Sequence, residues 1–134
     1  MKRPRRIVLL GSTGSIGRSA LDVIGRFPDR LRATALAANN NADMMVRQVR
    51  RFRPDMVALA DPDAALRVRR RLRRLRRPPR VLAGSEGILA AARGAPADVV
   101  LSAMVGTAGL LPTLAAVEAG RDVALANKET LVMA

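Results

Sequence analysis

The chain has 134 residues, 49% of them hydrophobic, which suffices for one domain with a buried core but not for two. It has no cysteine and no histidine, so disulfides, thiolate or imidazole metal sites and histidine-based triads are excluded within these residues. The net charge is +13, and of 24 basic residues only Lys2 and Lys128 are lysines, which indicates a bias towards arginine codons.

The first apolar run, at residues 7–10, predicts a buried strand. It holds four residues before it stops at Gly11, whereas an export signal needs about 7–15 apolar residues. No stretch reaches the length of a membrane span. We therefore expect a cytoplasmic protein without membrane contact.

Apolar runs and helical patterns then alternate to the end of the chain. Strands are predicted at residues 6–10, 33–38, 56–60, 81–82, 98–102 and 123–126. Helices are predicted at residues 15–27, 43–52, 61–77, 85–92 and 110–119, with another beginning near residue 127. This order predicts an α/β fold, a doubly wound, Rossmann-like and mostly parallel sheet with helices on both faces.

Helical spacing also predicts which side chains face the sheet. In the first helix the buried face would hold Ile16, Ala20, Val23, Ile24 and Phe27. The helix at 43–52 would bury Met45, Val46 and Val49. The next helix would be capped by Asp61 with Pro62 in its first turn, and the helix at 85–92 by Gly84 or Ser85.

The basic charge is densest at residues 67–80, where nine of fourteen residues are arginine. Such a run attracts nucleic acid or other phosphates. Only Phe27 and Phe52 are aromatic, so stacking platforms for single-stranded nucleic acid are missing. We expect a solvated helix face, with Arg70, Arg71, Arg74 and Arg77 in water, and no nucleic-acid partner.

A glycine-rich turn joins the first strand to the first helix. Gly11, Gly14 and Gly17 have the spacing G-x-x-G-x-x-G, with three hydroxyl side chains between them as possible donors. Glycine permits a sharp reversal and a close approach of a pyrophosphate, and the helix start offers free N–H groups. The turn predicts a dinucleotide-phosphate site, and a plain structural turn is the alternative.

The end of the second strand bears on which dinucleotide binds. It reads Asn39-Asn40-Asn41, with no acid before Asp43. An acid there would hold a ribose 2′-hydroxyl and favour NAD, whereas a neutral tip tolerates the 2′-phosphate of NADP. The tip favours NADP, with Arg47 within reach of a phosphate. The alternative is that the asparagines only form a turn and cap the helix.

The last predicted strand runs into Asn127-Lys128-Glu129. Ligands of open parallel sheets gather at the carboxyl ends of the strands. An amide, an ammonium and a carboxylate there could contact a nicotinamide and an anionic substrate. The alternative is a helix start, with Asn127 as its cap and Glu129 favourable to the helix dipole.

Three segments together resemble one family. They read LGSTGSIG at residues 10–17, MVGTAGLLPTLAA at 104–116 and LANKETLV at 125–132. Nearly the whole chain resembles the N-terminal, NADPH-binding part of the 1-deoxy-D-xylulose 5-phosphate reductoisomerase family. The glycine loop alone would also fit semialdehyde dehydrogenases, whereas the last segment is specific.

The resemblance implies an NADPH-dependent oxidoreductase and isomerase of non-mevalonate isoprenoid biosynthesis. It would convert 1-deoxy-D-xylulose 5-phosphate to 2-C-methyl-D-erythritol 4-phosphate. Residues 1–134 would be its NADP-binding Rossmann-like domain, within a longer homodimeric enzyme. The cofactor would contact the residues at the family's matching positions, namely Thr13, Gly14, Ser15, Ile16, Asn41, Asn127 and Glu129. Lys128 would contact the phosphorylated sugar substrate.

The family also uses a divalent metal, magnesium, manganese or cobalt, whose ligands would lie outside this chain. We therefore expect no catalytic or metal-binding residue within it, and no activity from it alone. Asn39 and Asn40 replace the glycine and basic residue usual in the family, which weakens the predicted grip on the 2′-phosphate. The alternatives are another NAD(P)-dependent reductase of the semialdehyde dehydrogenase type, or a non-catalytic nucleotide-binding module.

Overall fold

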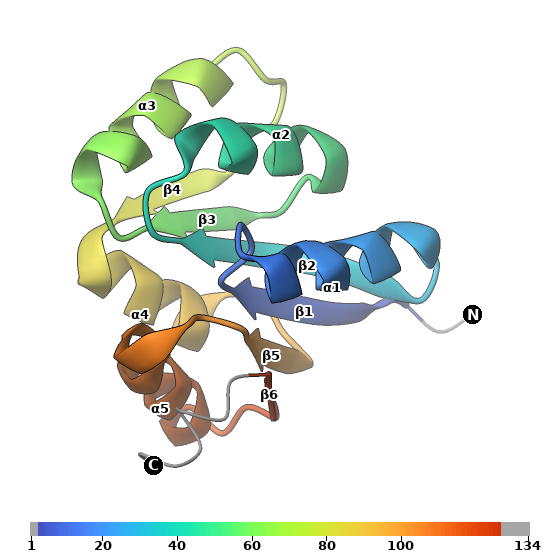
Figure 1. Ribbon diagram of the computed structural model, residues 1–134. Helices are drawn as coiled ribbons and strands as arrows, with labels where there is room; N and C mark the ends of the chain where they lie inside the picture. The colour runs from blue at the N-terminus through green and yellow to red at the C-terminus, as the bar shows by residue number, and fades with distance from the viewer. Residues whose placement is uncertain (1–2, 127–134) are drawn as a thin grey trace.

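The computed structural model describes residues 3–126, in which six strands alternate with helices (Figure 1). The strands are β1 (Arg5–Leu10), β2 (Leu31–Ala38), β3 (Met56–Leu59), β4 (Arg80–Ala83), β5 (Val99–Ser102) and β6 (Val123–Leu125). The helices are α1 (Ser15–Arg26), α2 (Ala42–Phe52), α3 (Pro62–Leu72), α4 (Gly84–Gly94), the 3-10 helix η1 (Gly106–Gly109) and α5 (Leu110–Glu118). None of the helices in this part of the chain is long and apolar enough to span a membrane.

All described strands are parallel, and they form one sheet in the order β4-β3-β2-β1-β5-β6. The order reverses beside β1, because the chain first adds strands on one side of it and then returns to the other. The carboxyl ends of β1 and β5 therefore form the switch point where doubly wound folds bind ligands. The predicted fold class is confirmed.

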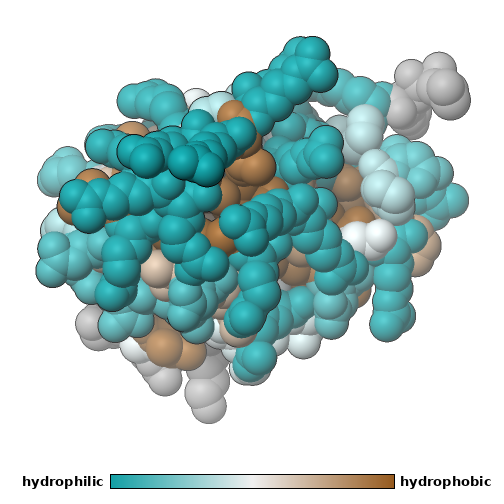
Figure 2. All heavy atoms as spheres, turned by 90° about the horizontal axis from the view of Figure 1, so that it is seen from above, coloured by the Kyte–Doolittle hydropathy of each residue, from teal (hydrophilic) through white to brown (hydrophobic). Residues whose placement is uncertain are grey.

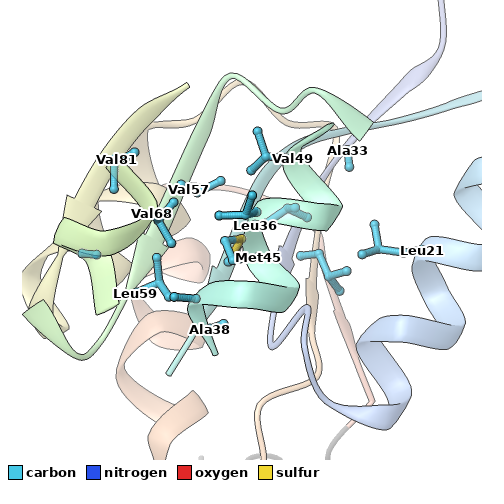
Figure 3. Close-up of a cluster of buried hydrophobic side chains, with 14 of the residues drawn as sticks. Leu21, Ala33, Leu36, Ala38, Met45, Val49, Val57, Leu59, Val68 and Val81 are labelled. Atoms are coloured by element: carbon cyan, nitrogen blue, oxygen red, sulfur yellow. The ribbon is translucent and has the colours of Figure 1, made fainter. Parts of the chain in front are cut away.

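Two layers of helices cover the sheet (Figure 1). Helices α1, α2 and α3 lie on one face, where Leu21, Met45 and Val68 pack in a single apolar cluster (Figure 3). Helices α4 and α5 cover the other face, where Ile88 and Ala116 belong to a second cluster. Successive residues of β1 alternate between the two clusters, which explains its unbroken apolar sequence.

The predicted buried face of α1 is wrong by part of a turn. Ile24 is buried and Ala20 packs against the core, as predicted. Ile16, Val23 and Phe27 are instead 44%, 49% and 46% exposed, and Gly17 and Leu21 are buried in their place. The inward face of α2 is confirmed, since Met45, Val46 and Val49 are buried. The difference arises because Gly17 lies against the turn after β1, and this contact sets the rotation of α1 about its axis.

The arginine-rich helix is shorter than predicted. Helix α3 has the predicted Asp61 cap and Pro62, but it ends at Leu72 and not at residue 77. A turn follows, in which the Leu75 N–H donates to the Leu72 carbonyl and Leu75 packs against the core. The proline pair at 78–79 restricts only the residue directly before it, so it accounts for the predicted end at residue 77 and not for the end at Leu72.

The arginine side chains lie in water as predicted. Arg70, Arg71, Arg74 and Arg77 are all exposed. Figure 2, a view from above Figure 1, shows hydrophilic side chains over most of this face, with apolar atoms visible between them. The predicted cap of α4, Gly84 or Ser85, is wrong by one or two residues. The residue at the N-cap position is Ala83.

Candidate dinucleotide-binding site

The turn after β1 and the segment after β5 touch at the switch point. The Ala103 N–H donates to the Leu10 carbonyl at 2.8 Å. Gly11 has φ +93°, and a Cβ atom there would lie 2.7 Å from the Ala103 carbonyl oxygen. Only glycine satisfies both constraints at this position.

Gly17 brings α1 against the same turn. A Cβ atom on Gly17 would lie 2.0 Å from the Gly11 carbonyl oxygen. The space around Gly14 is different, because a Cβ atom there would have only the Gly11 oxygen near it, at 3.8 Å. The first and third glycines are thus packed against backbone, and the middle one borders an open cradle at the start of α1.

The turn leaves several backbone donors free. The N–H groups of Gly11 and Ser12 both donate to the Ala37 carbonyl of β2. Within residues 3–126, the N–H groups of Thr13, Ser15 and Ile16 form no hydrogen bond, and no side chain caps α1. Free N–H groups at a helix N-terminus, together with the helix dipole, suit a phosphate group.

Ser12 does not face this cradle, so only two of the three hydroxyls in the turn are available to a ligand. Its side chain is fully buried, and its Oγ has no hydrogen-bond partner among the described residues. The Ser12 carbonyl instead accepts a hydrogen bond from Nε2 of Gln48 on α2, at 2.9 Å. Sequence reasoning missed Gln48, although a glutamine one residue before the buried Val49 was a visible signal.

The asparagine tip follows β2 at the same edge of the sheet and is exposed. Asn41 caps α2, because its Oδ1 accepts the Met44 N–H at 3.1 Å. The capping alternative is therefore correct for this oxygen, while the side-chain NH2 of Asn41 forms no hydrogen bond with any residue in the range 3–126. Asp43, the first acid after β2, forms an ion pair with Arg71 of α3. Arg47 is exposed and has no ion pair in the part of the chain that the structure describes.

The other predicted contacts follow β6. The Ala126 N–H donates to the Ser102 carbonyl, so the chain is still attached to the carboxyl edge at this residue. Asn127, Lys128 and Glu129 come next and lie outside the described residues, so their roles stay predictions. Ser102 itself is buried and its Oγ lies 2.8 Å from Oγ1 of Thr113 on α5, which ties α5 to β5.

Charged groups elsewhere do not complete a metal centre. Among residues 3–126, no group of three or more carboxylate, histidine or cysteine side chains could hold a metal ion. Asp98 lies at the opposite edge of the sheet, where hydrogen bonds from the side chain and backbone N–H of Arg6 lower its pKa to about 2. A hollow of about 1170 Å³ lined by Arg32, Arg53 and Arg76 also opens at that edge. Neither contributes to the cradle.

A family model described as 1-deoxy-D-xylulose 5-phosphate reductoisomerase matches residues 7–134. The curated protein of that name from Thermosynechococcus vestitus is 48% identical over 124 residues, which is 92% of this chain and 30% of the relative. That from Geotalea uraniireducens is 46% identical over 130 residues, 97% of this chain and 33% of the relative. The chain thus spans about a third of the length of the curated relatives it matches.

The solved structures that this chain resembles are also named reductoisomerases, like the curated relatives. The 1-deoxy-D-xylulose 5-phosphate reductoisomerase from Zymomonas mobilis in complex with NADPH matches with a TM-score of 0.89 and 39% identity, over 98% of this chain and 34% of that chain. DOX-P reductoisomerase in complex with NADPH, fosmidomycin and magnesium matches with a TM-score of 0.90 and 37% identity, over 97% of this chain and 32% of that chain. The three segments that carried the resemblance all lie within the matched region.

Proposed function

This chain belongs to the 1-deoxy-D-xylulose 5-phosphate reductoisomerase family, and we propose that it supplies the NADPH-binding part of such an enzyme. The protein would convert 1-deoxy-D-xylulose 5-phosphate to 2-C-methyl-D-erythritol 4-phosphate in non-mevalonate isoprenoid biosynthesis. It would act in the cytoplasm as a homodimer, on a phosphorylated sugar and without a nucleic-acid or membrane partner. Residues 1–134 would form one NADP-binding Rossmann-like domain.

One observation carries the proposal, the cradle between the turn after β1 and the start of α1. Its middle glycine has open space beside it, and the N–H groups of Thr13, Ser15 and Ile16 are free among the described residues. These features fit the pyrophosphate of a dinucleotide. When bound, NADPH supplies a hydride for the reduction. The residues of the turn hold and orient it, and Gly14 lets it approach the backbone.

The tip after β2 favours NADPH over NADH. Asp43, the acid that could bind a ribose 2′-hydroxyl, is already paired with Arg71. The Asn41 side-chain NH2 and the exposed Arg47 are then the groups that would receive a 2′-phosphate. Beyond the described residues, Asn127 and Glu129 would lie near the cofactor and Lys128 would contact the substrate.

The divalent metal of the family does not fit the described residues, because they hold no suitable group of ligands. We therefore place magnesium, manganese or cobalt outside this part of the protein and assign no step to it here. Turnover would require the segments that make the curated relatives about three times as long.

Calorimetric titration with NADPH and with NADH tests the cofactor assignment. We expect NADPH to bind at least about tenfold more tightly, equivalent to about 1.4 kcal/mol. Tighter binding of NADH would contradict the proposal. Binding of neither dinucleotide, together with salt-sensitive binding of RNA or DNA, would instead favour a non-catalytic nucleic-acid module.

An activity assay tests the reaction. With 1-deoxy-D-xylulose 5-phosphate and magnesium, a protein that carries this chain at the full length of the curated relatives should oxidise NADPH, and the 134-residue chain alone should not. Turnover of aspartate semialdehyde by that full-length protein would favour the alternative reductase. Steady oxidation of NADPH by the 134-residue chain alone would show that these residues suffice for catalysis.

A further inference from the structure

Helix α2 buries an amide against the glycine turn. Gln48 is 7% exposed and is the only polar side chain among the buried residues of α2. Its Nε2 donates to the Ser12 carbonyl at 2.9 Å, across 36 positions of sequence, while its Oε1 is buried and has no partner among the described residues. Burying a half-satisfied amide is unfavourable, so core packing alone does not explain a glutamine here.

The bond fixes the direction of the next backbone donor. The Ser12 carbonyl and the Thr13 N–H belong to one planar trans peptide group, so the two point in opposite directions. Gln48 holds the carbonyl towards the interior. The Thr13 N–H is therefore turned away from the interior, and it is one of the free donors of the cradle.

We propose that Gln48 is a positioning residue for the cofactor, which sets the Thr13 N–H towards the pyrophosphate by holding the Ser12 carbonyl. This inference rests on the proposed NADPH binding. It also connects the two phosphate-binding regions, because α2 begins at the asparagine tip and reaches the glycine turn through Gln48. Helix α2 would thus fix the position of the 2′-phosphate region relative to the pyrophosphate region.

The test compares two ligands on the purified protein by calorimetry. Gln48→Met keeps the side-chain length and removes the donor. NADPH, which carries the pyrophosphate, should bind about tenfold more weakly to this variant, the equivalent of one lost hydrogen bond. Adenosine 2′-monophosphate, which has no pyrophosphate, should bind within about twofold of the unsubstituted protein. A general loosening of the fold would weaken both ligands together.

Val68→Ala is the matched control. Val68 is fully buried on α3, in the same apolar cluster as α2 but away from the glycine turn. Its truncation lowers stability by creating a cavity. At a temperature where the variant is folded, it should bind both ligands as the unsubstituted protein does.

Gln48→Glu provides a second variant should the methionine protein fail to fold. The carboxylate has the shape of the amide, but its oxygens only accept hydrogen bonds and cannot donate to the Ser12 carbonyl. The carbonyl would no longer be held, so NADP⁺ should bind more weakly to Gln48→Glu than to the unsubstituted protein. A protonated carboxyl group is again a donor. Acidification below its pKa, which burial raises from about 4.3, should restore affinity relative to the unsubstituted protein at the same pH.

The outcomes separate this inference from the proposed function. If the unsubstituted protein binds neither NADPH nor NADH, the proposed function fails. If it binds NADPH but Gln48→Met binds NADPH equally well, or weakens both ligands to the same degree, the positioning role of Gln48 is wrong and the proposed function stands.

Discussion

The three glycines of the turn after β1 have different physical roles. Gly11 has a positive φ and lies against Ala103, and Gly17 lies against the carbonyl of Gly11. Gly14 has an ordinary extended conformation and open space beside it. Two of the glycines are thus required by the packing of the protein itself, whereas nothing among the described residues requires glycine at position 14.

Replacing each glycine by alanine separates these roles. Gly17→Ala sets a methyl group 2.0 Å from a backbone oxygen, so we expect a loss of at least about 2 kcal/mol of unfolding free energy. Gly14→Ala meets no clash and should change stability by less than about 1 kcal/mol, yet the added methyl group fills the cradle and should weaken NADPH binding. Chemical denaturation and calorimetry measure the two effects, and unchanged NADPH affinity in Gly14→Ala would contradict the cradle.

The ion pair between Asp98 and Arg6 predicts a dependence of stability on pH. Hydrogen bonds from Arg6 lower the pKa of Asp98 from 3.8 to about 2 in the folded state. The charged carboxylate of Asp98 therefore stabilises the fold fully above pH 3.8. This stabilisation is lost as the pH falls towards 2. Asp98→Asn should be less stable than the parent at neutral pH, and the difference should shrink in acid. If the stability difference between Asp98→Asn and the parent stayed constant as the pH fell to about 2, the charge of Asp98 would not be the source of that difference.

At the scale of elements, α2 combines a structural and a proposed binding role. Its cap, Asn41, lies at the tip where a 2′-phosphate would bind, and its first acid is held by Arg71 of α3. The packing of α3 beside α2 therefore places a positive charge next to the first acid after the tip. This neutralisation needs both helices and cannot be seen in either sequence segment alone.

Two substitutions of Asn41 separate capping from binding. Asn41→Asp keeps an oxygen cap, so stability should be unchanged, but its charge repels a 2′-phosphate and should lower NADPH affinity about tenfold with little effect on NADH. Asn41→Ala should cost about 1 kcal/mol of stability through the lost cap. Denaturation and paired titrations measure both, and equal weakening of NADPH and NADH by Asn41→Asp would argue against a 2′-phosphate at the tip.

At the scale of the whole molecule, apolar side chains are exposed at one end of the sheet. On α5, Leu111 and Val117 are 64% and 55% exposed, and Leu125 of the edge strand β6 is 40% exposed. Helix α5 is apolar on its outer side as well as its inner side. Exposed apolar surface beside a strand edge that no other described strand pairs with favours association of chains.

Polar substitutions on α5 should reduce this association. Leu111→Ser and Val117→Ser together should lower the average mass of the 134-residue chain at high concentration, measured by sedimentation. Each should change stability by no more than about 1 kcal/mol because the side chains are exposed. Leu66→Ser, on the exposed side of α3, is the control and should leave the mass unchanged. Equal masses for all variants would show that α5 does not drive association.

Much of this architecture was already determined by the sequence. Apolar runs predicted all six described strands within about two residues, because buried parallel strands need continuous apolar side chains. The glycine spacing predicted the turn and its free donors, and three segments identified the family that the comparisons confirm. These features depend on residues close together in the chain, so local chemistry suffices to predict them.

Only the tertiary structure decided those features that depend on contacts between residues far apart in the chain. The rotation of α1 follows from the contact of Gly17 with the turn, and helical periodicity alone placed Ile16, Val23 and Phe27 inward by mistake. The neutralisation of Asp43 by Arg71 and the bond from Gln48 to Ser12 join positions 28 and 36 residues apart. A sequence pattern reports how side chains repeat along one element, but which polar groups meet depends on how neighbouring elements pack.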